Sequence, residues 1–154
     1  MPRAVIDAGV FVDYFVKVRG CEEYHMQARS VIERLSELAC MVYEPFILEI
    51  EFSAVLVRHV SDRDVVRSIV RRVLRHVVLV PEEELHELAL GIALSTGCRA
   101  VDAYYVSTAV KESAMLVTCD HLMYENAKKL NVEAYNVRAY ESYADLVNRL
   151  QQCH

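Results

Sequence analysis

The chain has 154 residues, of which 54% are hydrophobic and 25% charged, and its formal net charge is −5. This composition excludes a disordered chain, and the lack of an apolar run of about 20 residues excludes a transmembrane helix. The N-terminal stretch MPRAVIDAG lacks the apolar core of a signal peptide, so we expect a cytoplasmic protein.

Short apolar runs alternate along the chain with longer segments in which apolar residues recur at helical spacing. The runs predict strands near residues 3–7, 41–43, 77–80, 115–119 and 133–135. The longer segments predict helices over 22–39, 46–59, 62–76, 82–96, 101–113, 121–130 and 141–151. Because no linker or repeat divides the chain, we expect one domain over 1–154. The alternation predicts an α/β fold with helices on both faces of a parallel sheet.

Five cysteines show neither a CxxC motif nor a Cys/His ligand spacing, so a zinc site is not expected. They are Cys21, Cys40, Cys98, Cys119 and Cys153. Small core residues are the simplest interpretation, and one intramolecular disulfide stays open.

Two aspartates follow predicted strands directly. Asp7 ends VID and Asp120 ends LVTCD. In a parallel sheet, ligands bind beyond the carboxyl ends of the strands, so both acids are candidate site residues. Two carboxylates at one edge repel each other and raise a pKa unless a cation lies between them.

Two acids on predicted helices complete the candidate set. Asp102 lies in the first turn of VDAYYVSTAV, where it could equally be a helix-capping acid. Glu51 shares a helix face with Leu48 and Val55, so its carboxylate needs a partner. Glu49 is the competing candidate, and we prefer Glu51.

Four carboxylates from four segments suit Mg²⁺ or Mn²⁺, which take oxygen ligands. They are Asp7, Glu51, Asp102 and Asp120. The chemistry indicated is attack of a metal-activated water on a phosphodiester. The acidic net charge argues weakly against nucleic-acid binding, but two bound divalent cations would bring it to about −1.

The acids occur in the ordered segments VIDAGVFVDYF, PFILEIEFSAVL, VDAYYVSTAV and LVTCDHLMYENAKKLNV. This set, spread over residues 3–135, resembles the PIN-domain family, in particular the VapC-like toxins of toxin–antitoxin pairs. Asp7 matches the strand-end aspartate of the family, and Glu51 the glutamate six residues after a proline, here Pro45. Asp102 matches the helix-opening Asp-Ala pair before an aromatic residue, and Asp120 the Thr-x-Asp at a strand end.

The resemblance implies a three-layer α/β/α sandwich with a mainly parallel central sheet of four to five strands. It also implies endoribonuclease activity on RNA dependent on Mg²⁺ or Mn²⁺, a homodimer, and a small VapB-like antitoxin as partner. The chain departs from the family after Asp7, where Ala8 and Gly9 replace the usual Ser, Thr or Asn. We therefore expect a hydrogen bond that orients Asp7 to be missing and metal affinity to be weaker.

Two further polar residues could support the site. Thr118 could hydrogen-bond a site acid, or be an ordinary β-branched strand residue. Asp13 could also support the acids, but we favour a solvated helix acid. Tyr104 and Tyr105, beside Asp102, are the tyrosines expected near the site, where rings could stack on bases.

A stripe of arginines at four-residue intervals marks the helix predicted over 62–76. It consists of Arg63, Arg67, Arg71 and Arg75. The stripe is either the solvated face of an amphipathic helix or a surface that binds the RNA backbone.

Two alternatives to a toxin ribonuclease stay open. One is a PIN-domain nuclease in RNA processing or quality control without an antitoxin. The other is a catalytically weak PIN-like interaction module, to which the Ala8–Gly9 departure gives weight.

Overall fold

The computed structural model describes residues 1–153 and has a five-stranded sheet at its centre. The strands are β1 (Arg3–Ile6), β2 (Met41–Pro45), β3 (Val78–Val80), β4 (Met115–Thr118) and β5 (Ala134–Asn136). They pair in the order β3-β2-β1-β4-β5, and every pair is parallel. The predicted α/β class is therefore confirmed, with five strands and no antiparallel pair in the described sheet.

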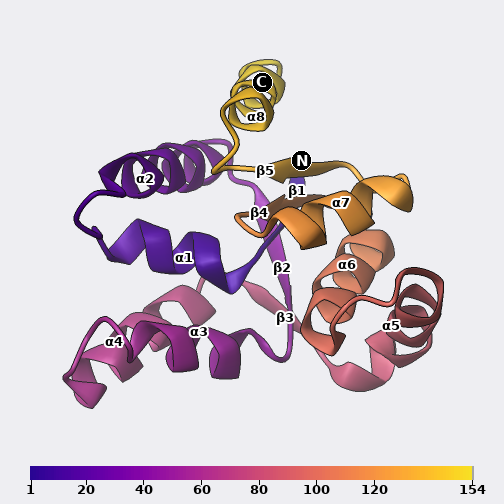
Figure 1. Ribbon diagram of the computed structural model, residues 1–154, viewed down its shortest axis with the longest axis horizontal. Helices are drawn as coiled ribbons and strands as arrows, with labels where there is room; N and C mark the ends of the chain where they lie inside the picture. The colour runs from indigo at the N-terminus through magenta and orange to yellow at the C-terminus, as the bar shows by residue number, and fades with distance from the viewer. Residues whose placement is uncertain (154) are drawn as a thin grey trace.

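Eight helices surround this sheet in the described residues. They are α1 (Ala8–Phe15), α2 (Glu22–Glu37), α3 (Leu48–Leu56), α4 (Arg63–Leu74), α5 (Glu82–Thr96), α6 (Ala100–Glu112), α7 (His121–Lys129) and α8 (Tyr140–Gln151). Figure 1 shows α1, α2 and α3 on one side of the sheet and α5, α6 and α7 on the other. This is the expected three-layer α/β/α sandwich.

The sequence pattern explains where several of the elements begin or end. Asp62 accepts hydrogen bonds from two backbone amides at the start of α4, and Gly97 ends α5 in the left-handed conformation. Helix α3 begins later than expected, because β2 continues through Pro45 and the amide of Phe46 still donates to Val80 of β3 at 3.0 Å. Helix α1 follows β1 after a single residue, Asp7.

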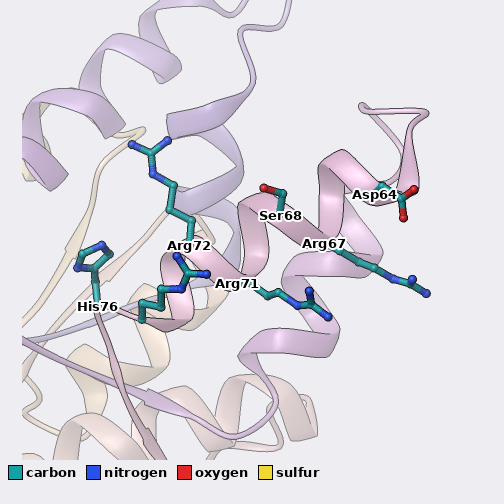
Figure 2. A pocket seen from close by; sticks show the side chains of 7 residues that line it. Asp64, Arg67, Ser68, Arg71, Arg72 and His76 are labelled. Atoms are coloured by element: carbon teal, nitrogen blue, oxygen red, sulfur yellow. The ribbon is translucent and has the colours of Figure 1, made fainter.

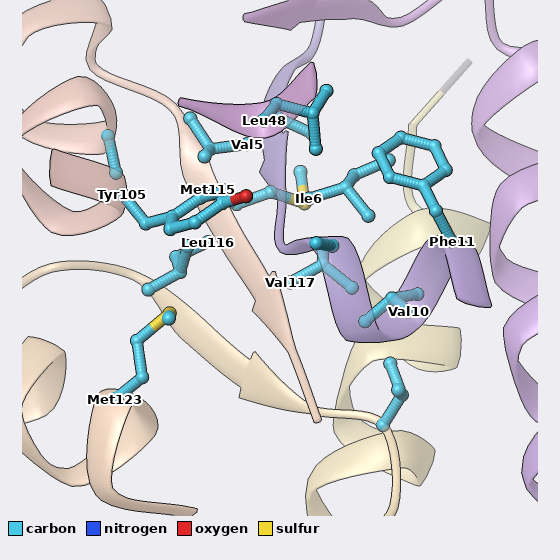
Figure 3. Close-up of a cluster of buried hydrophobic side chains, with 14 of the residues drawn as sticks. Val5, Ile6, Val10, Phe11, Leu48, Tyr105, Met115, Leu116, Val117 and Met123 are labelled. Carbon is cyan, nitrogen blue, oxygen red and sulfur yellow. The ribbon is translucent and has the colours of Figure 1, made fainter. Parts of the chain in front are cut away.

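Both faces of the two central strands are buried, which is why β1 and β4 read as continuous apolar runs. Val5 pairs with Leu116, and Ile6 with Val117. Figure 3 shows Val5 and Leu116 facing Tyr105 of α6, while Ile6 and Val117 face Val10 of α1. Packing on both faces of the sheet fixes the positions at which β1 and β4 end, and the candidate acids Asp7 and Asp120 follow those ends.

No helix of the described chain combines the length and apolarity that crossing a bilayer requires. The five cysteines are all free thiols, so the disulfide left open by the sequence does not form.

Candidate active site

Asp7 immediately follows β1, and Asp120 follows the adjacent parallel strand β4 after one residue, Cys119. Each aspartate also caps the helix that comes next. Asp7 accepts a hydrogen bond from the amide of Val10 at 3.1 Å, and Asp120 accepts one from the amide of Met123 at 3.0 Å. The strand-end acids are therefore fixed by local capping as well as by the sheet.

Asp7 is 4% exposed and is surrounded by donors. Its Oδ2 accepts from the hydroxyl of Thr118 and from the amide of Cys119 at 3.1 Å. The thiol of Cys119 lies 3.8 Å from Oδ1, in position to donate to it. These contacts orient the carboxylate without any side chain at positions 8 or 9.

The prediction that Asp7 lacks an orienting hydrogen bond is therefore wrong. A Cβ atom placed on Gly9 would lie 2.4 Å from the Sγ of Cys119 and 3.1 Å from Oδ1 of Asp7. Cys119 thus fills the space that a Ser, Thr or Asn after Asp7 would need, and donors from β4 and its end replace those from α1. Metal affinity itself stays a prediction.

Thr118 links the two strand-end acids. It is fully buried, and while its hydroxyl donates to Asp7, its Oγ1 accepts from the backbone amide of Asp120 at 2.9 Å. A hydroxyl can donate and accept at once, which an apolar β-branched residue cannot. Thr118 therefore couples the position of Asp7 to that of Asp120.

Glu51 and Glu49 lie on different faces of α3. Glu49 is exposed, whereas Glu51 is half-buried beside Asp7, Asp102 and the hydroxyl of Tyr105. The Oε2 atom of Glu51 and the Tyr105 hydroxyl are buried and have no hydrogen-bond partner within the described residues. Glu51 is thus the α3 glutamate that faces the other acids.

Glu44 is a fully buried acid that the sequence analysis missed. Its Oε1 accepts from the amide of Ile6 at 2.7 Å, and its Oε2 lacks a partner in the described part of the chain. Burial raises its pKa well above the usual value, and neighbouring Asp7 and Glu51 raise it further. The sequence did contain a signal for this burial. Glu44 directly follows the strand predicted over 41–43, and that strand belongs to a sheet expected to be covered by helices on both faces.

Asp102 and Asp120 are bridged by an arginine. Arg99 donates from Nη2 to Asp102 Oδ1 at 3.0 Å and to Asp120 Oδ2 at 2.8 Å, and from Nε to Asp102 Oδ2 at 3.2 Å. Asp102 is 2% exposed and caps no backbone amide, so the alternative of a capping acid does not describe it. The spacing of three residues between Arg99 and Asp102 on a helix is a signal that sequence reasoning could have used.

Negative charge is concentrated at this edge of the sheet. Burial raises the pKa of Asp7, hydrogen bonds from Thr118, Val10 and Cys119 lower it, and Asp120 raises it. Burial likewise raises the pKa of Glu51; the Tyr105 hydroxyl lowers that pKa, whereas Asp7 and Asp102 raise it. A cation among these groups would stabilise their ionised forms.

The carboxylate oxygens are the kind of ligand that a hard divalent cation prefers, but they do not surround one common position. Within residues 1–153, no three Asp, Glu, His or Cys side chains are close enough to hold a metal ion together. Asp102 and Asp120 bind Arg99, while Asp7 is held by Thr118 and Cys119. That the four acids together hold a metal stays a prediction. All four acids offer oxygen, the unpartnered Oε2 of Glu51 is available, and a positive group already lies between two of the carboxylates. On these grounds the residues fit Mg²⁺ or Mn²⁺.

Asp13 is not the solvated acid that we favoured. It is 7% exposed and receives two hydrogen bonds from Arg138, at 3.0 and 2.8 Å. The same guanidinium lies 4.6 Å from the centre of the Tyr24 ring. This pair joins α1 to the segment after β5, and nothing in the sequence pattern marks Arg138 as its partner, because the two residues are 125 positions apart.

The tyrosines beside Asp102 occupy two different environments. Tyr105 is fully buried between α6 and the sheet, so its ring cannot stack on a base. Tyr104 packs edge-on against Phe46, with 5.0 Å between ring centres, and its hydroxyl donates to Glu82 at 3.2 Å. The stacking hypothesis is wrong for Tyr105.

The arginine stripe runs along α4 to Arg75, the residue just after its end, and within the described residues none of the four arginines forms an ion pair with a carboxylate. A groove of about 560 Å³ runs along this helix, and its lining consists of Asp64, Arg67, Ser68, Arg71, Arg72, Arg75 and His76. Arg63 does not line it. Figure 2 shows Arg67 and Arg71 extending from the same side of α4, while Arg72 turns the other way.

Comparisons with known proteins agree with this arrangement. The solved structure of PAE2754 from Pyrobaculum aerophilum has a TM-score of 0.61 and 18% identity, covering 96% of this chain and 98% of that chain. FitAcB from Neisseria gonorrhoeae has the same TM-score and identity, covering 88% of this chain and 98% of that chain. These likenesses concern the fold alone.

A search of curated protein sequences gave no significant match. The family model for the PIN domain matches residues 4–129, the stretch that contains all four candidate acids. The chain therefore belongs to the PIN-domain family.

Proposed function

We propose that this PIN domain is a Mg²⁺- or Mn²⁺-dependent endoribonuclease and the toxin of a VapBC-type toxin–antitoxin pair. PIN-domain proteins are generally metal-dependent nucleases. The observation that supports the proposal is that Asp7 and Asp120 follow the adjacent strands β1 and β4, with Arg99 joining Asp120 to Asp102 and with Glu51 close enough to Asp7 and Asp102 for both to raise its pKa.

The chain supplies ligands and orientation to this reaction, and no nucleophilic side chain is needed. A bound divalent cation would activate water for attack on an RNA phosphodiester and stabilise the leaving oxygen. Asp102, Asp120 and Glu51 would hold it together with Asp7. Thr118 and Cys119 fix the carboxylate of Asp7 so that it needs little reorganisation.

Helix α4 supports RNA as the substrate. Most described arginines outside α4 donate to a carboxylate: Arg29, Arg34, Arg99, Arg138 and Arg149. Within the described residues, no α4 arginine has such a partner, although the chain as a whole is acidic. Unpaired guanidinium groups along a groove are free to bind successive phosphates of an RNA strand.

The direct test is cleavage of a pooled RNA library with Mn²⁺ or Mg²⁺. Asp120→Asn is the informative variant, because asparagine preserves the cap on α7 while removing the charge. We expect cleavage by the wild-type protein in either metal and none in EDTA or by the variant. Cleavage that persists in EDTA would contradict the proposal.

The antitoxin and the homodimer belong to the same proposal. We expect a small VapB-like protein, encoded next to this chain, to form a stable complex with it and to inhibit RNA cleavage in the cytoplasm. An RNA-processing nuclease would instead have no such neighbour. Exposed apolar side chains on α5 and α6 support self-association, including Leu94, 79% exposed, and Val110, 42% exposed. Light scattering after gel filtration measures the oligomeric state.

A further inference from the structure

Arg99 contacts two of the four candidate metal ligands at once. Its Nη2 lies 3.0 Å from Asp102 and 2.8 Å from Asp120. Among the ion pairs of residues 1–153, no other cationic side chain reaches two carboxylates. The arginine therefore sits where a shared cation of these two acids would lie.

The burial of the three partners is unequal. The side chain of Asp102 is 2% exposed and that of Asp120 is 32% exposed, whereas that of Arg99 is 68% exposed. A buried carboxylate needs a counter-charge, whereas an exposed guanidinium is already largely hydrated and loses little by leaving its partners. Asp102 therefore depends on a cation more than Arg99 depends on Asp102.

The Asp13–Arg138 pair provides a contrast within the same protein. Arg138 is 38% exposed, and its guanidinium lies against the Tyr24 ring, so several contacts fix it at once. Arg99 is held by the two acids and has no aromatic partner within the described residues. The first arrangement suits a permanent structural contact, the second an exchangeable one.

We infer that Arg99 is the resident counter-ion of Asp102 and Asp120 in the metal-free protein, and that a divalent cation binds there by displacing its guanidinium. The inference rests on the proposed metal-dependent function and assigns a role to a residue outside the acid set. Arg99 is a positioning residue, which occupies and neutralises the two carboxylates through its hydrogen bonds until a metal replaces it.

The geometry makes such an exchange a small movement. The guanidinium holds the carboxylate oxygens at 2.8 and 3.0 Å, whereas Mg²⁺ binds oxygen at about 2.1 Å. The two carboxylates need to close in by less than about 1 Å each, which side-chain rotation can supply without backbone change.

Exchange lowers the apparent affinity for metal, because part of the binding free energy is spent on releasing the arginine. Removing Arg99 should therefore strengthen Mn²⁺ binding, by about tenfold for a partly solvated charge-assisted contact. Lysine at this position keeps a positive charge but loses the forked geometry, so its effect should be intermediate.

The test combines calorimetry with nuclear magnetic resonance. Mn²⁺ is titrated into the wild-type protein, Arg99→Ala, Arg99→Lys and the control Arg29→Ala, which removes an exposed arginine paired with Glu33 on α2. In parallel, Mg²⁺ is titrated into ¹⁵N-labelled wild-type protein while the Nε–H signal of Arg99 is followed. The Arg99→Lys spectrum assigns that signal.

We expect Arg99→Ala to bind Mn²⁺ about tenfold more tightly and Arg29→Ala to bind it as the wild type does. The Nε–H signal should move to the position of a solvated arginine as Mg²⁺ binds. If that signal stays in place while the amides of Asp102 and Asp120 respond, or if both alanine variants bind equally, the inference is wrong and the metal site stands. If neither the wild type nor Arg99→Ala binds Mn²⁺, both this inference and the metal-dependent function are overturned.

Discussion

Arg138 holds Asp13 by two hydrogen bonds of 3.0 and 2.8 Å, which tie α1 to the segment that follows β5. Because α1 begins at the cap residue Asp7, this pair anchors the far end of the helix whose start lies in the candidate active site.

The first prediction concerns the stability that this pair provides. Asp13→Asn removes the charge from a buried partner and leaves Arg138 without its carboxylate, so the free energy of unfolding should fall by about 2 kcal/mol. Urea denaturation measures the change. The matched control is Glu33→Gln in the exposed Arg29–Glu33 pair, which should cost less than about 0.5 kcal/mol. Equal effects of the two substitutions would contradict the anchoring role.

The second prediction separates the two glutamates of α3. Glu51→Gln should lower RNA cleavage by about 10- to 100-fold, because Glu51 lies beside Asp7 and Asp102. Glu49→Gln should leave cleavage unchanged, because Glu49 is exposed on another face. Initial rates over a range of Mn²⁺ concentrations make the comparison, and the loss in Glu51→Gln should shrink as the metal concentration rises. A larger loss in Glu49→Gln would reverse the assignment.

The third prediction is a pH dependence that arises from Glu44. Its pKa in the folded protein is raised well above the usual value of a glutamate, with burial as the largest cause. The folded state therefore holds a proton that the unfolded chain releases, and the free energy of unfolding decreases as the pH rises above about 4.5. In EDTA, Glu44→Gln should weaken this decrease. The free energy of unfolding of the variant should therefore rise relative to that of the wild type between about pH 5 and pH 8. A constant difference between the two proteins over that range would show that Glu44 does not titrate.

The fourth prediction tests the groove on α4. Replacing Arg67 and Arg71 by glutamine removes two groups that line it, and the slope of log Kd against log salt for RNA binding should fall by about 1.4. The control is the double substitution Arg29→Gln and Arg34→Gln, which removes the same charge from arginines already paired with glutamates. Identical slopes for the two double variants would remove α4 from the RNA path.

The fifth prediction concerns the contact between Gly9 and Cys119. A Cβ at position 9 would lie 2.4 Å from the Sγ of Cys119, so Gly9→Ala should destabilise the protein by about 1–3 kcal/mol. Removing the sulfur makes room, and most of this loss should disappear when Gly9→Ala is combined with Cys119→Ala. Urea denaturation of the single and double variants gives the coupling energy. Strict additivity would mean that Cys119 does not exclude a side chain at position 9.

Except for α1, which was not among the predicted helices, the order of strands and helices follows from local signals in the sequence. Apolar runs and helical spacing are properties of neighbouring residues, and so are caps such as Asp62 and Gly97. The same signals place Asp7 and Asp120 at strand ends, because each acid both ends an apolar run and begins a helix. Helical periodicity alone favoured Glu51 over Glu49.

Contacts between distant segments depend on strand order, which local signals do not encode. Only the tertiary structure brings Arg138 to Asp13, turns Glu44 into the interior and fills the space above Gly9 with Cys119. It also places Asp120 beside Arg99, 21 residues earlier in the chain, so that one guanidinium contacts both Asp120 and Asp102. The sequence by itself placed Asp7 and Asp120 at the ends of two strands. The packing of β1 against β4 and α6 decided what each acid touches, since a buried charge takes whichever partner the fold brings within reach.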